Sequence, residues 1–293
     1  MRTTRAALLV TGASSGIGLE TAVYLAERGF QVYAGLRNVS RRDRLDAEAR
    51  RRGVQLDVIP LDVTDEADIQ TAVGTIVARA GGIYGLVNNA GIALRGFFED
   101  LADAEIRQVF ATNVFGTMAV TRAVLPHMRA ARQGRIVIVT SVGGRSGSFA
   151  LSAYCAAKFA LEGFGESLAL ELSPLGIQVT LVEPGIIKTE IWGANRGIAK
   201  GALDPHSAYA ARFNEAERLV DWLVASSPTK PVDVARAVHR ALTVERAGLR
   251  YLVGWRTRLV LAAERYLPGK LYKRLIYDEA LRRATKVGQS LTK

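Results

Sequence analysis

Tyr154 and Lys158 lie four residues apart in a segment with helical periodicity, and Ser141 precedes Tyr154 by thirteen residues. A spacing of four places both side chains on one face of a helix. A phenol with a pKa near 10 is a weak acid–base catalyst at neutral pH, but a lysine ammonium one turn away favours the phenolate and lowers that pKa. Tyr154 can then give a proton to a carbonyl oxygen as hydride reaches the carbon, or take one in the reverse direction. The Ser141 hydroxyl, at the end of a predicted strand, can hydrogen-bond the same oxygen. For Tyr154 taken alone, a half-buried helix tyrosine without a catalytic role is the alternative.

A glycine-rich turn, Thr11-Gly-Ala-Ser-Ser-Gly-Ile-Gly18, follows one predicted strand and opens a predicted helix. Glycines allow a tight turn and a close approach to a pyrophosphate, and the helix N-terminus adds free N–H groups. The spacing is Gly-x-x-x-Gly-x-Gly, which differs from the commoner Gly-x-Gly-x-x-Gly fingerprint. The turn therefore predicts a dinucleotide site, with a strand–helix turn that binds nothing as the alternative. Its candidate cofactor-binding residues are Gly12, Ser14, Ser15, Gly16, Ile17 and Gly18.

The end of the second predicted strand bears on the choice between NAD and NADP. An acidic residue there would accept hydrogen bonds from the ribose 2′-hydroxyl, but this chain has Leu36 and Arg37. Arg37 can pair with a 2′-phosphate in a bidentate manner, so we predict that NADP(H) is preferred over NAD(H). The alternative is an arginine that is only a solvated charge. Ser14 or Ser15 can also contact the 2′-phosphate, and the sequence does not choose between them.

Short apolar runs alternate with helical patterns along the chain. The predicted strands are 6–11, 31–36, 55–61, 85–88, 135–140, 178–183 and 250–254. The predicted helices are 17–28, 41–52, 66–80, 104–132, 153–172, 208–224, 232–244, 257–267 and 270–286. This alternation predicts an α/β fold, a Rossmann-like doubly wound parallel sheet of about seven strands with helices on both faces. Parallel strands connected in this way bring their C-terminal ends, and the candidate residues that follow them, to one edge.

We expect one domain over residues 1–293 with three parts. Residues 6–185 form the dinucleotide-binding and catalytic core. Residues 186–231 lack a strand signal and contain several glycines, so they are predicted to form a substrate cap over the strand edge. Residues 255–293 form a basic C-terminal helical extension, interrupted at Pro268-Gly269.

Positive charge is concentrated at the C-terminal end. Lys and Arg number 39 against 28 Asp and Glu, a net charge of +11. The basic residues of the tail alternate with apolar ones at helical spacing and no nucleic-acid-binding motif is present, so we expect no nucleic-acid partner. A basic amphipathic segment can lie on an anionic membrane. The alternative, which we favour here, is a helix pair packed on its own domain or on a partner subunit.

Cysteine and histidine usage argues against disulfides and metals. Cys155 is the single cysteine, which suits a reducing compartment, and its helix position points it away from the Tyr154 face, so we assign it to packing. His127, His206 and His239 have no ligand spacing, so no metal is expected. No apolar run approaches the length of a spanning helix. We therefore expect a cytoplasmic protein, with a membrane-peripheral location as the option that the basic tail leaves open.

Two asparagine positions complete the candidate set. Asn88-Asn-Ala-Gly91 ends the fourth predicted strand, where the asparagines can brace the sheet and Gly91 can admit the cofactor. Asn113 lies inside the predicted helix 104–132, where asparagine is mildly unfavourable and needs a reason such as a kink or a water site. A solvent-facing Asn113 is the alternative.

Taken together, these residues resemble the short-chain dehydrogenase/reductase family over about residues 6–192. The positions that carry the resemblance are the Thr-Gly-x-x-x-Gly-x-Gly turn, Asp62, Asn88-Asn-Ala-Gly91, Asn113, Ser141, Tyr154-x-x-x-Lys158 and Pro184-Gly185. The resemblance implies a catalytic set of Asn113 in a proton-relay water path, Ser141 as carbonyl-oxygen stabiliser, Tyr154 as acid–base and Lys158 as ribose binder. It implies further cofactor-binding residues, namely Asp62 at the adenine, Thr189 at the nicotinamide carboxamide, and Val63, Asn89, Ala90, Gly91, Pro184 and Gly185. It also implies a homodimer or homotetramer.

Within that family, the segments ending at Arg37 and beginning at Tyr154 look like the 17β-hydroxysteroid and retinol dehydrogenase branch. We therefore expect an NADP(H)-dependent oxidoreductase that interconverts a lipophilic ketone or aldehyde and an alcohol of steroid, retinoid or lipid type. Two other functions remain open. One is a cofactor-binding regulatory or scaffold protein with little turnover, and the other is an epimerase or isomerase with a tightly retained cofactor.

Overall fold

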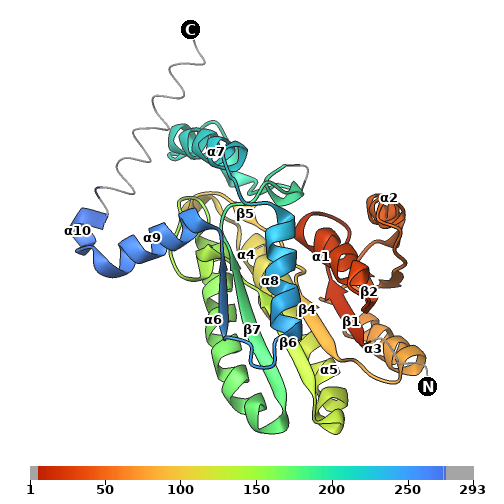
Figure 1. The fold of residues 1–293 in the computed structure, drawn as a ribbon. Coiled ribbons are helices and arrows are strands. Elements are labelled where there is room, and N and C mark those ends of the chain that lie inside the picture. Colours follow the sequence, from red (N-terminus) through yellow and green to blue (C-terminus); the bar gives the residue numbers. More distant parts are fainter. Residues whose placement is uncertain (1–5, 194, 273, 275–293) are drawn as a thin grey trace.

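The fold is built on one seven-stranded parallel sheet (Figure 1). The computed structural model describes residues 6–193, 195–272 and 274. The strands are β1 (Ala7–Thr11), β2 (Gln31–Leu36), β3 (Asp57–Pro60), β4 (Gly85–Asn88), β6 (Gly134–Val139), β7 (Ile177–Pro184) and β9 (Arg250–Val253). Their order in the sheet is β3-β2-β1-β4-β6-β7-β9. The order reverses direction between β1 and β4, and the loops that follow these two strands therefore diverge and leave a crevice.

Helices cover both faces of this sheet, as the alternating pattern predicts. One face is covered by α1 (Gly16–Glu27), α2 (Asp43–Arg51) and α8 (Pro231–Thr243), the other by α3 (Glu66–Ala80), α5 (Gly116–Ala131) and α6 (Ser152–Leu172). Successive residues of a strand point to opposite faces of the sheet. Leu8 and Val10 of β1 pack on the face covered by α1, α2 and α8, and Leu9 packs on the face covered by α3, α5 and α6. Because both faces are buried, the strands read as continuous apolar runs.

The remaining elements lie around one end of the sheet. They are β5 (Leu94–Arg95), α4 (Asp103–Phe110), β8 (Gly197–Ile198), α7 (Ala210–Ala225), α9 (Trp255–Tyr266) and α10 (Gly269–Tyr272). In Figure 1, α7 lies beyond the end of the sheet, and α9 and α10 extend away from the body of the fold. No helix in the described residues is long and apolar enough to span a membrane.

Two expectations about elements need correction, and a third lies largely outside the described residues. The predicted helix 104–132 is divided into α4 and α5 by a π-helical turn, Ala111–Phe115. The segment 186–231 does contain a strand, because β8 pairs in parallel with β5; two residues are too few to give a periodic signal. Of the predicted helix 270–286, the structure describes α10 only, and the rest falls largely on residues outside the described part of the chain.

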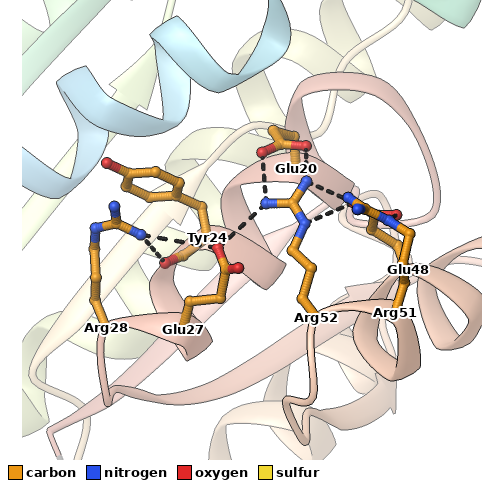
Figure 2. Close-up of polar contacts among 7 residues, drawn as sticks. All are labelled: Glu20, Tyr24, Glu27, Arg28, Glu48, Arg51 and Arg52. Carbon is orange, nitrogen blue, oxygen red and sulfur yellow. Dashed lines mark hydrogen bonds and ion pairs between the residues drawn. The ribbon is translucent and has the colours of Figure 1, made fainter.

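An ionic cluster ties α1 to the end of α2 (Figure 2). The Arg52 guanidinium donates to both oxygens of Glu20, at 2.9 and 2.6 Å, and to Glu48 at 2.6 Å. Glu27 lies 3.2 Å from the same guanidinium. The hydrogen bonds from Arg51 and Arg52 hold the pKa of Glu48 at about 2, below its ordinary 4.5. The cluster therefore fixes the helix that begins at the glycine turn.

Candidate active site

The glycine turn packs so closely that side chains cannot be added to it. Gly12 and Gly16 have φ of +67° and +57°, a backbone conformation that glycine adopts without strain. A Cβ on Gly12 would lie 2.8 Å from the Cα of Ala90, and one on Gly18 would overlap the carbonyl oxygen of Gly12 and the amide of Asn89. Helix α1 begins at Gly16 with no side-chain cap and no acidic residue in its first turn. Its N–H groups are therefore available to an anionic group.

Thr11 and Asn89 hold this turn against the end of β4. The Thr11 hydroxyl accepts hydrogen bonds from the backbone N–H groups of Asn89 and Ala90, both at 3.0 Å. In return, the Asn89 amide donates to the carbonyl oxygens of Thr11 at 3.0 Å and Gly12 at 3.1 Å. Asn88 braces the sheet as expected, donating to the Thr121 hydroxyl at 2.9 Å. Thr11 is not among the residues predicted from sequence to form the site, although it directly precedes the first glycine of the turn.

The glycine turn, Asn89 and Ala90 border a cleft of about 430 Å³, within the size range of cofactor pockets. The structure brings every residue predicted to bind the cofactor to this one cleft. Its lining includes Gly12, Ser14, Ser15, Gly16, Ile17, Gly18, Arg37, Asp62, Val63, Asn89, Ala90, Gly91, Tyr154, Lys158, Pro184, Gly185 and Thr189. Residues missed from sequence include Arg41, Thr112, Ile187, Glu190, Trp192 and Asn195, which lie on the cleft without a spacing pattern of their own. Because Gly12 and Gly18 let the turn pack tightly against the end of β4, the free N–H groups at the start of α1 border the cleft, which suits the pyrophosphate of a dinucleotide.

Two arginines lie where the cleft meets the end of β2. Arg37 is exposed and Arg41 lines the same cleft. Leu36 is fully buried in the core, so its side chain does not face the cleft, and Arg37 is the residue that can contact a ribose 2′-substituent. Asp62 also lies on the cleft, with one carboxylate oxygen accepting from the backbone and hydroxyl of Thr64 at 2.9 and 2.7 Å.

Ser141, Tyr154 and Lys158 meet at the inner end of the cleft. Ser141 follows β6, and its hydroxyl oxygen accepts from the backbone N–H of Gly143 at 3.0 Å. Tyr154 and Lys158 lie on α6, with the lysine Nζ 5.7 Å from the centroid of the tyrosine ring. Lys158 is buried, and its Nζ donates to the carbonyl oxygen of Val139 at 2.9 Å. The predicted triad is therefore assembled from one strand end and one helix.

The electrostatics of this triad differ from our expectation. Burial raises the pKa of Tyr154 to about 12, although a hydrogen bond with Ser141 acts in the opposite direction. Burial lowers the pKa of Lys158 to about 8, opposed by the negative charge of Glu162. The net lowering of the tyrosine pKa that we expected is wrong for this structure, because desolvation of the phenol outweighs the contributions that favour the phenolate. At neutral pH, Tyr154 is a neutral phenol and can donate a proton, while Lys158 is mainly cationic.

Asn113 has a structural role that the sequence did not reveal. It is fully buried in the π-helical turn, so the solvent-facing alternative is wrong. Its side chain donates to the carbonyl oxygen of Ile92 at 2.9 Å and accepts from the N–H of Ile92 at 2.8 Å. The amide therefore holds the loop that follows Gly91, and the side chain does not line the cleft, whereas the neighbouring Thr112 does.

A second cavity, of about 390 Å³, adjoins the first at the triad. Both cavities are lined by Ser141, Tyr154, Gly185 and Trp192. The walls of the second are mainly apolar and come from residues 141–155, the loop residues 185–192, helix α7 with the loop 227–229 after it, and the start of α9. Cys155 lies on this wall beside Tyr154, so our expectation that it points away from the catalytic face is wrong. Its burial raises the pKa of the thiol, which keeps it an apolar lining group.

Residues 6–197 match the short chain dehydrogenase family. The chain belongs to this family. Relatives of this short-chain dehydrogenase include human retinol dehydrogenase 8, which is 39% identical over 83% of this chain and 79% of the relative. Human 17-beta-hydroxysteroid dehydrogenase type 1 is 34% identical over 90% of this chain and 79% of its own length. The resemblance to the hydroxysteroid and retinol dehydrogenase branch is thus confirmed.

Solved structures agree with the fold. A variant of actinorhodin polyketide ketoreductase with NADPH is 32% identical, covers 86% of this chain and 97% of its own, and has a TM-score of 0.73. A short-chain dehydrogenase/reductase from Burkholderia phymatum in complex with NAD is 25% identical, covers 90% and 93% of the two chains, and has a TM-score of 0.77. This short-chain dehydrogenase is accordingly an oxidoreductase of CH–OH groups with a nicotinamide cofactor.

Behind the triad of this short-chain dehydrogenase lies a buried ionic cluster that the sequence analysis missed. The Arg250 guanidinium contacts Glu162 and Glu183, both at 3.0 Å, and Arg145 contacts Glu183 at 3.1 Å. Burial and the nearby charge of Glu162 raise the pKa of Glu183. Glu162 is one helical turn beyond Lys158, so this cluster carries the negative charge that favours the lysine cation. These residues come from separate elements, and no local spacing connects them.

Proposed function

We propose that this protein is an NADP(H)-dependent oxidoreductase that interconverts a lipophilic ketone or aldehyde and the corresponding alcohol. The observation that carries the proposal is the meeting of two cavities at Ser141 and Tyr154. One has a mixed polar and apolar lining and is bordered by the glycine turn, and the other is mainly apolar. A nicotinamide at the inner end of the first would face a carbonyl held in the second, with the phenol beside both.

The chemistry assigns a separate task to each residue of the triad. NADPH bound in the cleft supplies the hydride. Tyr154, a neutral phenol at pH 7, gives its proton to the carbonyl oxygen, and the Ser141 hydroxyl donates a hydrogen bond to that oxygen as negative charge develops on it. The Lys158 cation stabilises the phenolate that remains and holds the cofactor ribose. The oxidation of an alcohol uses the same groups in reverse.

Preference for NADP(H) rests on Arg37 and Arg41. Both line the cleft beyond β2, and no carboxylate replaces them at the end of that strand. A guanidinium can pair with a 2′-phosphate through two parallel hydrogen bonds, an interaction that NAD(H) cannot make. Asp62 at the adenine and Thr189 at the carboxamide remain part of the proposal, since both lie on the cleft.

A lipophilic substrate is favoured by the lining of the second cavity. Leu219 and Leu223 of α7, together with Val260 of α9, form part of its wall. The names of the retinol and 17-beta-hydroxysteroid dehydrogenases refer to substrates of this kind. For the protein as a whole, we infer a homodimer or homotetramer in the cytoplasm.

The test is a comparison of NADPH and NADH. Binding of each cofactor is measured by nicotinamide fluorescence. Oxidation of the preferred cofactor is then measured with steroid, retinoid and aliphatic carbonyl compounds as substrates. Arg37→Gln is expected to raise the KM for NADPH about ten-fold or more, because a charge-assisted pair is lost, and to leave the KM for NADH unchanged. Arg50→Gln, on the exposed side of α2 and away from the cleft lining, is the matched control. Equal use of both cofactors by the unaltered protein would remove the NADP(H) preference.

Tight cofactor binding without turnover of any carbonyl compound would favour the scaffold function. A cofactor retained through purification would favour an epimerase.

A further inference from the structure

Helix α9 carries a stripe of large apolar side chains that face solvent. Trp255 is 59% exposed, Leu259 60% and Tyr266 77%. With the exposed Ala262 they follow the spacing i, i+4, i+7, i+11, which places them within roughly 60° of the helix circumference. We call these four residues the α9 stripe.

The opposite side of α9 packs on the protein. Thr257 is buried, and Thr257 and Val260 line the apolar cavity. The start of α9 therefore contacts its own domain at Thr257, whereas packing of the whole tail stays a prediction. The α9 stripe points away from it, and α9 extends from the body of the fold (Figure 1).

Basic residues flank the α9 stripe on both sides. At about 100° per residue, Arg256 lies on one side and Arg258 and Arg265 lie on the other, whereas Glu264 lies on the opposite face. All three arginines are exposed. The Arg256 and Arg258 side chains are held by the carbonyl oxygens of Ser226 at 3.0 Å and Leu252 at 3.3 Å.

We propose that the α9 stripe docks on an anionic lipid bilayer. Tryptophan and tyrosine side chains suit the level of the lipid headgroups, and arginines beside an apolar stripe complement anionic phosphates. The single acidic residue of the helix faces away, so no repulsion opposes contact. Exposed Leu271 and Lys270 of α10 continue the same apolar and basic character.

Docking in this way would hold the apolar cavity next to the bilayer. Arg256, Thr257 and Val260 of α9 belong to the cavity lining, one turn or less from the α9 stripe. A lipophilic substrate could then move around α9 between the bilayer surface and the cavity that holds Tyr154. This last step rests on the proposed function, but the docking does not.

The experiment is sedimentation of the full-length protein with vesicles, at about 0.1 M salt. One set is phosphatidylcholine alone, and the other contains about 30% phosphatidylglycerol. We expect binding to the anionic vesicles, a loss of at least ten-fold in Leu259→Ser/Tyr266→Ser, and weakening as salt rises. Arg258→Gln/Arg265→Gln is expected to lose about five-fold or more per charge. Leu170→Ser, which changes a residue 78% exposed on α6, is the matched control and should bind like the unaltered protein.

Three outcomes would overturn the proposal. They are no sedimentation with anionic vesicles, binding that Leu259→Ser/Tyr266→Ser leaves unchanged, and a change in oligomeric state on that substitution without vesicle binding. The last would identify a second copy of the chain as the occupant. Far-ultraviolet circular dichroism reports whether each variant is folded. A protein that binds vesicles but reduces no carbonyl compound would refute the proposed function and leave the docking intact.

Discussion

Replacing Glu48 by Gln should lower stability in a pH-dependent way. Glu48 accepts hydrogen bonds from Arg51 at 2.7 and 2.6 Å and from Arg52 at 2.6 Å, and these hold its pKa at about 2 (Figure 2). A carboxylate with a lowered pKa stabilises the folded state above its unfolded pKa, near 4.5. That contribution is lost as pH falls from about 5 towards 2.

The expected loss of stability follows from the pKa of Glu48 and from the exposure of its two arginine partners. A fall in the pKa of Glu48 from 4.5 to about 2 means that its ionised form contributes at most about 3 kcal/mol to the free energy of unfolding. The Arg51 side chain is 67% exposed, so solvent screens its share, whereas Arg52 is only 15% exposed. We therefore expect the substitution to cost about 1–2 kcal/mol at pH 7. In urea, that cost lowers the unfolding midpoint by about 0.3–0.7 M for a chain of this size.

The assay is urea unfolding at several pH values and one protein concentration, followed by far-ultraviolet circular dichroism. Glu171→Gln, an exposed position on α6, is the matched control and should leave the midpoint unchanged at every pH. The difference between the unaltered protein and Glu48→Gln should be largest at pH 7 and shrink as pH falls below 4.5. A difference that stays constant with pH, or is absent at pH 7, would show that the ionic cluster does not stabilise the fold.

Three further predictions concern the site. Gly18→Ala should weaken NADPH binding more than ten-fold in fluorescence titrations, because the added Cβ overlaps the Gly12 carbonyl and the Asn89 amide; unchanged affinity would contradict the packed turn. The kcat/KM for ketone reduction should fall as pH rises through about 8, because Lys158 loses its charge there, and a flat profile to pH 10 would remove that charge from the mechanism. Leu219→Asp should raise the KM for lipophilic ketones while leaving NADPH affinity unchanged, since the residue lines the second cavity and not the cleft, and a parallel loss of both would show a general structural defect.

Much of the sheet could be predicted because its signals are local. Each strand is a short apolar run, and several strand ends carry a site residue, as with Gly12 after β1 and Ser141 after β6. Parallel topology then brings these ends to one edge. This is why Arg37 and Ser141, far apart in the chain, could be assigned to one edge from the residues themselves, whereas Thr189 was implied only by the family resemblance.

What could not be predicted depends on contacts between distant segments. The π-helical turn at Asn113 forms with the amide bound to the backbone of Ile92, twenty-one residues earlier. The raised pKa of Tyr154 depends on burial by several elements, which the spacing to Lys158 does not show. The exposure of Trp255 is likewise a property of where α9 lies, because an amphipathic pattern does not say which face meets the protein.

The most direct test of the proposed chemistry compares the unaltered protein with Tyr154→Phe. NADPH affinity is measured by nicotinamide fluorescence, and turnover is measured as NADPH oxidation with a lipophilic ketone that the unaltered protein reduces. Loss of the proton donor predicts unchanged NADPH affinity to within about two-fold and a fall in kcat of at least about a hundred-fold. Turnover that survives in Tyr154→Phe would contradict the assignment of Tyr154 as the acid–base group.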